Sequence, residues 1–115
     1  MATSTALLII DVQQGLCEGP GAAHATPALI ERLNAVSGRC RAAGIPVIFI
    51  QHESTKGYLP YGSREWQLAD GLQAEPGDRR IRKTTPDSFL RTELQATLDA
   101  LDVRELIIGG MHSEF

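Results

Sequence analysis

The chain has 115 residues, of which 43% are hydrophobic and 22% charged, as in an ordinary globular domain rather than a disordered segment. Its net charge of -3 and lack of a long basic run argue against nucleic acid or an anionic membrane as partners. The first apolar run meets an acidic residue too early for a signal peptide or a membrane span. We therefore expect a cytoplasmic protein that binds a small-molecule substrate.

The first half of the chain predicts a strand, a helix and a second strand. Residues 6–10 form a continuous apolar run ending at Asp11, which is typical of a strand buried on both faces of a parallel sheet. Residues 29–40 carry apolar side chains at the helical period, and Gly44 marks the end of that helix. Residues 47–50 repeat the pattern of the first strand. Because such crossovers are right-handed, we expect the two strands to pair in parallel.

The second half predicts a long excursion followed by a strand, a helix and a strand. Residues 53–79 are rich in Gly, Pro and polar side chains, and we expect one short helix there, around Trp66. Residues 80–83 alternate as a short strand, a helix begins near Pro86, and residues 105–108 form a fourth strand. The predicted helix carries regularly spaced leucines, namely Leu90, Leu94, Leu98 and Leu101.

These elements predict one α/β domain over residues 1–115, with three α/β/α layers and a mostly parallel, Rossmann-like, doubly wound sheet. The fourth strand is so apolar that we expect it inside a sheet covered on both faces. Only two long crossover helices are predicted to cover that sheet. We therefore expect at least one more helix and strand, so that the domain is incomplete at its C-terminus.

The predicted site lies at the carboxyl ends of the strands, where ligands bind in open parallel sheets. Asp11 ends the first strand, Lys83 ends the third, and Gly109 and Gly110 end the fourth. A carboxylate and an ammonium at a partly dry sheet edge can act as a proton-transfer pair. An ordinary buried ion pair that orients the sheet is an equally good interpretation from spacing alone.

Three segments in order carry a resemblance to a known family. They are Leu-Ile-Ile-Asp-Val-Gln-Gln at 8–14, Lys-Thr-Thr-Pro-Asp-Ser-Phe at 83–89 and Ile-Ile-Gly-Gly-Met-His-Ser-Glu-Phe at 107–115. With them the whole chain resembles the isochorismatase-like cysteine hydrolases. The resemblance implies a catalytic Asp-Lys-Cys triad. Its first two members match Asp11 and Lys83, and its Cys would directly follow Phe115.

The resemblance also implies the chemistry of that site. The thiolate of the Cys would attack a carbonyl, so hydrolysis of an amide C–N bond is the leading hypothesis. Vinyl ether hydrolysis, which does not need the Cys, is the alternative. Relatives contain a cis peptide bond that would join Met111 to His112 here, where the His112 N–H would help to stabilise an oxyanion. The family further implies a homo-oligomer.

Other residues have weaker candidate roles. Gln51, His52 and Trp66 are candidates for the substrate pocket. Some relatives hold a metal through an Asp-x-His motif after the second strand, but the Asp is missing here, so we expect no catalytic metal. We also expect no cofactor, because the chain lacks the glycine patterns of nucleotide-binding loops. Cys17 is a less favoured nucleophile, and Cys40 lies on the apolar face of the first helix as a core residue.

Two other classes of function compete with cysteine hydrolysis. Phosphoryl transfer through an aspartyl nucleophile requires a second Asp two residues after the first, where this chain has Gln13. A non-catalytic binding or assembly module would use the same crevice without turnover.

Overall fold

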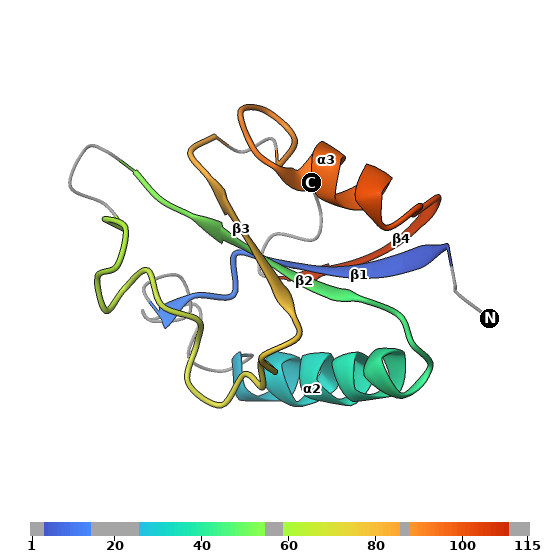
Figure 1. Cartoon of the computed structure of the whole chain (residues 1–115). Helices are drawn as coiled ribbons and strands as arrows, with labels where there is room; N and C mark the ends of the chain where they lie inside the picture. Colours follow the sequence, from blue (N-terminus) through green and yellow to red (C-terminus); the bar gives the residue numbers. More distant parts are fainter. Residues whose placement is uncertain (1–3, 15–25, 55–58, 86–87, 111–115) are drawn as a thin grey trace.

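The computed structural model describes residues 4–14, 26–54, 59–85 and 88–110. Their elements, in chain order, are β1 (Thr5–Ile10), α2 (Thr26–Ala42), β2 (Val47–His52), β3 (Arg79–Lys83), α3 (Leu94–Ala100) and β4 (Glu105–Gly110). The four strands form one parallel sheet in the order β3-β2-β1-β4 (Figure 1). This confirms the predicted parallel α/β fold. No helix within the described ranges combines the length and apolarity needed to cross a bilayer.

The two helices cover opposite faces of the sheet, with α2 below it and α3 above it in Figure 1. Successive side chains of a strand point to opposite faces, so each central strand supplies both cores. The core on the α2 side contains Leu7, Ile9, Val12, Leu33, Cys40, Val47, Phe49 and Ala69. The core on the α3 side contains Ala6, Leu8, Ile48, Ile50, Ile81, Leu94 and Leu98. This double burial explains why β1 and β2 are continuous apolar runs.

The helix α3 is shorter than its leucine spacing predicts. The expected start near Pro86 is wrong, because residues 88–93 form turns and the helix begins at Leu94. Arg91 has a left-handed backbone with φ of +56°, which a continuous α-helix cannot contain. The side-chain hydroxyl of Thr92 then accepts the N–H of Leu94 at 3.2 Å. Leu90 consequently lies outside the helix and is exposed.

The segment between β2 and β3 contains turns where a short helix around Trp66 was predicted, so that prediction is wrong. Its backbone instead bonds to the chain that continues from β1. The N–H of Gln14 donates to the carbonyl of Gln67 at 2.8 Å, and the N–H of Ala69 donates to that of Val12 at 3.0 Å. These partners lie far away in the sequence, which is why local propensity does not predict them.

β4 lies at an edge of the described sheet, beside β1. Its apolar side chains are exposed on both faces: Leu106 by 37%, Ile107 by 42% and Ile108 by 56%. Within the described chain β4 is therefore not covered on both faces, and the prediction that a further helix and strand cover it remains a prediction. β4 is firmly placed at its carboxyl end, where Gly110 has a φ of +150° and a Cβ atom would overlap the backbone of Ile10. Only glycine fits there.

Candidate active site

Asp11 stands immediately after β1 in a strained backbone conformation. Its φ is +63°, in the left-handed region that residues other than glycine rarely adopt. Its N–H donates to the carbonyl of Ile50 on β2 at 3.0 Å, which fixes the turn. Strain of this kind concentrates at functional sites, and here it directs a buried carboxylate along the carboxyl edge of the sheet.

Lys83, the last residue of β3, reaches the same place from two strands away. Its Nζ atom lies 3.3 Å from Oδ1 and 3.4 Å from Oδ2 of Asp11. The two side chains are only 3% and 10% exposed, so water screens the pair weakly. Because β2 lies between β1 and β3, the ion pair spans the end of β2. The structure therefore brings together the two residues that the sequence predicted. Oδ1 of Asp11 accepts no hydrogen bond of good geometry within the described chain.

Gln13 binds the end of β2 to the neighbouring loop through its side-chain amide. Oε1 accepts the N–H of His52 at 2.8 Å, and Nε2 donates to the carbonyls of His52 at 2.9 Å and of Trp66 at 2.8 Å. The side-chain amide of Gln13 thus bonds to both the N–H and the carbonyl of His52, as the peptide group of a neighbouring strand would. Gln13 is fully buried with its hydrogen-bonding capacity used. Sequence reasoning missed this role, for which the available signal was an amide side chain two residues after the site aspartate, next to the apolar Val12.

Gln51, His52 and Trp66 lie beside this network, and each has a buried polar atom with no hydrogen-bond partner in the described chain. These atoms are Oε1 of Gln51, Nδ1 of His52 and Nε1 of Trp66. Gln51 donates through Nε2 to the carbonyl of Trp66 at 3.1 Å. Burial lowers the pKa of His52, and the nearby positive charge of Lys83 lowers it further. The predicted pocket residues thus lie at the carboxyl edge of the sheet, with His52 paired to Lys83, and each retains unused hydrogen-bonding capacity in the described chain.

An aromatic and charged rim borders the same edge. The guanidinium of Arg82 lies 3.5 Å from the ring centroid of Tyr61, whose ring meets that of Trp66 edge to face at 4.8 Å between centroids. Arg82 also donates two hydrogen bonds to Glu53, at 2.7 and 2.9 Å. The hydrogen bond to Glu53 raises the pKa of Arg82. The rim is therefore ordered by paired contacts although Tyr61 is exposed.

The remaining predicted residues have separate outcomes. Met111, His112 and Cys17 lie outside the described residues. Cys40 is a buried free thiol in the core against α2, as predicted, and burial raises its pKa. Within the described ranges, no three side chains of His, Cys, Asp or Glu gather in a group that could hold a metal ion.

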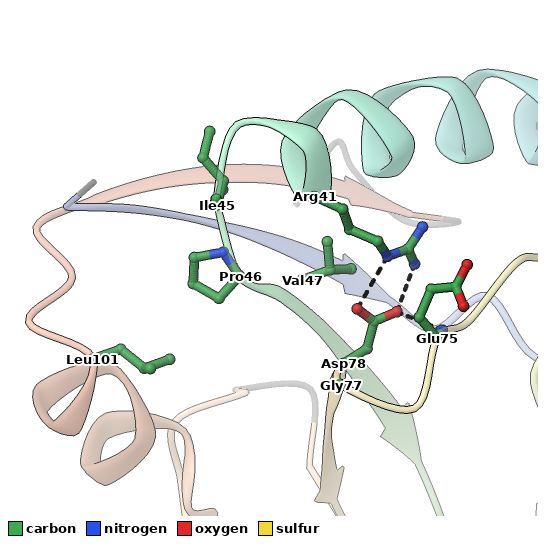
Figure 2. A pocket seen from close by; sticks show the side chains of 9 residues that line it. Arg41, Ile45, Pro46, Val47, Glu75, Gly77, Asp78 and Leu101 are labelled. Atoms are coloured by element: carbon green, nitrogen blue, oxygen red, sulfur yellow. Dashed lines mark hydrogen bonds and ion pairs between the residues drawn. The ribbon is translucent and has the colours of Figure 1, made fainter. Parts of the chain in front are cut away.

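A different polar feature lies at the amino end of the strands. Arg41 of α2 and Asp78, just before β3, border an open hollow of about 420 Å³ beside the start of β2 (Figure 2). Arg41 donates to Oδ1 of Asp78 at 3.1 Å and to Oδ2 at 2.5 Å, and the N–H of Glu75 donates to Oδ2 at 2.8 Å. These hydrogen bonds hold the excursion before β3 against α2, far along the strands from Asp11.

A parallel α/β fold with an Asp-Lys pair buried at its carboxyl edge is an arrangement that can carry an active site. Comparison with known proteins identifies the family. A model described as the isochorismatase domain matches residues 5–115. A crystal structure of an isochorismatase family protein superposes with a TM-score of 0.88 and 38% identity, over 100% of this chain and 68% of that one. The chain belongs to the isochorismatase family.

Two relatives with curated names are hydrolases. The chain is 36% identical to a streptothricin hydrolase from Streptomyces noursei, over 95% of this chain and 40% of that protein. It is 25% identical to a ureidoacrylate amidohydrolase from Stutzerimonas stutzeri (strain A1501), over 96% of this chain and 59% of that protein. The chain thus spans about half the length of these curated relatives.

Proposed function

We propose that this protein is a hydrolase that cleaves an amide C–N bond of a small molecule through an Asp-Lys-Cys triad. The observation that carries the proposal is the buried contact between Lys83 and Asp11 at the carboxyl edge of the sheet. The names of the two curated relatives support hydrolysis, and that of the second, an amidohydrolase, supports amide chemistry. The third member of the triad would be a Cys that follows Phe115.

In the proposed reaction, Asp11 accepts the thiol proton while the sulfur attacks the carbonyl carbon of the substrate. Lys83 lies against Asp11, where its positive charge would favour the thiolate of the attacking Cys. The tetrahedral oxyanion is stabilised by backbone N–H groups, with that of His112 as our candidate. Asp11 then returns the proton to the leaving amine, and water hydrolyses the thioester to release the acid. Oδ1 of Asp11, which lacks a hydrogen bond in the described chain, supports this role because it is available to accept a proton.

We also propose that residues 1–115 are the first part of one such domain, and that the protein is a cytoplasmic homo-oligomer. The exposed apolar side chains of β4 support further covering of that strand by protein. Light scattering coupled to size-exclusion chromatography tests the oligomer, which a monomeric mass would contradict.

The triad is tested by intact-mass measurement of the purified protein, with and without native iodoacetamide labelling. We expect a mass above the 12.5 kDa of these 115 residues and one fast-labelling thiol beyond Phe115. The Asp11→Asn variant should label that thiol more slowly, whereas the matched Asp78→Asn variant, at the other end of the strands, should label it at the wild-type rate. A mass of 12.5 kDa with slow labelling of Cys17 and Cys40 would exclude cysteine catalysis.

A further inference from the structure

His52, a candidate pocket residue from the sequence, stands at the carboxyl edge of the sheet. It is the last residue of β2, and its Cα atom pairs with that of Lys83 on β3. Residues paired in this way direct their side chains to the same face of the sheet. His52 and Lys83 therefore lie side by side on one face of the sheet, at the edge where Lys83 contacts Asp11.

The backbone of His52 is held on both sides. Gln13 bonds to its N–H and to its carbonyl, and the following residue, Glu53, donates its N–H to the carbonyl of Lys83 at 2.9 Å. These bonds fix the backbone of His52 and, with it, the position of its Cβ atom beside that of Lys83 on one face of the sheet.

The ring nitrogen Nδ1 is buried and has no hydrogen-bond partner in the described chain. An unpaired buried polar atom costs free energy, so such atoms in native structures require an explanation, and one is a ligand that arrives later. Burial and the charge of Lys83 keep the ring neutral near pH 7 by lowering its pKa. A neutral imidazole offers one donor and one acceptor, which suits a group that is itself uncharged.

The charged residues near His52 also favour an uncharged ligand group. Among the described residues at this edge, Lys83 already faces Asp11, and Arg82 already faces Glu53. A substrate carboxylate beside His52 would therefore lose its hydration without gaining an unpaired cation from these residues. An amide or ureido group offers an N–H donor and a carbonyl acceptor without a net charge, and it avoids that cost.

We propose that His52 is a substrate-binding residue that pairs its free ring nitrogen with an uncharged amide or ureido group, and so selects such substrates over carboxylates. This inference rests on the proposed amide hydrolysis at Asp11 and Lys83. It adds the residue that distinguishes the substrate amide from the carboxylate product, which favours release of that product after cleavage.

The experiment uses benzamide and benzoate, which have nearly the same shape, as binding probes for the intact protein. Titration calorimetry measures their affinities, and ¹⁵N NMR follows the imidazole nitrogens of His52, assigned by their loss in His52→Asn. We expect benzamide to bind more tightly than benzoate and to shift the Nδ1 resonance. His52→Phe should weaken benzamide binding about tenfold, the loss of roughly one hydrogen bond, with little effect on benzoate.

Arg80→Gln is the matched control, since Arg80 is an exposed residue of β3 and its replacement should change neither affinity. If His52→Phe does not fold, as judged by thermal unfolding, His52→Asn and the wild-type NMR titration provide the same test. Unchanged benzamide binding by a folded His52 variant, tighter binding of benzoate, or binding of neither probe would overturn the proposal. Because the probes do not require the thiol, this result is independent of the labelling test of the triad.

Discussion

Among the described residues, a partly buried ion pair at the amino end of the strands and a buried one at the carboxyl end differ in how completely they are bonded. At the amino end, Arg41 and Asp78 share two hydrogen bonds, and Asp78 accepts a further one from the Glu75 N–H. At the carboxyl end, Lys83 lies 3.3 and 3.4 Å from the two oxygens of Asp11, and Oδ1 has no hydrogen bond in the described chain. We call Arg41–Asp78 the saturated pair, because both carboxylate oxygens accept hydrogen bonds. We call Lys83–Asp11 the candidate reactive pair, because Oδ1 of Asp11 accepts none in the described chain.

This difference is what we expect between a structural ion pair and one that takes part in chemistry. In the first pair both carboxylate oxygens are engaged in holding two segments together. A pair with a free acceptor atom can take up a proton or bind an incoming group without first breaking its own contacts. Strain at Asp11 and unpaired atoms on Gln51, His52 and Trp66 occur at the same end, which strengthens the assignment of chemistry to it.

The largest expected effect comes from removing the cation of the reactive pair. Lys83→Met should lower amide hydrolysis by about a hundredfold to a thousandfold, because a preorganised charge beside the reacting groups is lost. Ammonia release from a panel of small primary amides, corrected for the folded fraction, measures this effect. If the folded variant retains more than half of the wild-type rate, Lys83 has no catalytic role and the proposed difference between the two ion pairs is contradicted.

The next effect tests whether the neighbouring amide network, rather than the ion pair itself, stabilises the reactive end. Gln13→Leu leaves the N–H and carbonyl of His52 and the carbonyl of Trp66 without their partner. We expect the free energy of unfolding to fall by about 3 kcal/mol, measured by urea denaturation. Gln73→Leu, at an exposed position, is the control and should change it little. A loss no greater than that of the control would show that the network contributes nothing.

The saturated pair should affect stability and leave catalysis unchanged. Arg41→Met leaves a largely buried Asp78 carboxylate with only the hydrogen bond from Glu75. We expect the unfolding free energy to fall by about 2 kcal/mol, less than for a fully buried pair because Arg41 is partly exposed. The rate of hydrolysis per folded molecule should equal that of the wild type. A slower rate would show that the ion pair at the amino end of the strands also affects catalysis, against this account.

The smallest effect is a pH dependence caused by His52. Burial lowers its pKa below the ordinary value of 6.5, so below that pH the unfolded chain binds its proton more readily than the folded protein does. Stability from this residue is therefore present above pH 6.5 and is lost as the pH falls. His52→Asn should show a shallower decrease in unfolding free energy between pH 7 and pH 5 than Arg80→Gln. Equal slopes would place His52 in water rather than beside Lys83.

The sequence predicted that Asp11 and Lys83 meet at one edge of the sheet, because the signals for this are local. An apolar run ending in an acidic residue, and a short strand ending in a lysine, are each visible within a few residues. The rule that ligands bind at the carboxyl ends of parallel strands then brings Asp11 and Lys83 to one edge. Three strands followed from apolar runs and the third strand, β3, from alternation, and each was found within two residues of its predicted bounds.

The features that the sequence did not predict depend on distant contacts. The Gln13 network requires the loop at Trp66 to return to the end of β1, which no local pattern encodes. The same return replaces the helix that was expected around Trp66 with turns. The helix α3 starts late because Arg91 adopts a left-handed backbone, a choice that helical leucine spacing cannot reveal. Exposure of β4 depends on what surrounds it, rather than on its own composition.

The most direct test compares two double variants that each replace an entire ion pair with neutral residues. They are Asp11→Asn with Lys83→Met, and Asp78→Asn with Arg41→Met, each measured for hydrolysis rate and unfolding free energy. Our account predicts that the first abolishes hydrolysis at near wild-type stability, since an under-bonded buried pair contributes little net stability. The second should lose about 2 kcal/mol of stability, because hydrogen bonds are lost, and keep the wild-type rate. The opposite assignment, with hydrolysis surviving the first replacement, would contradict the account.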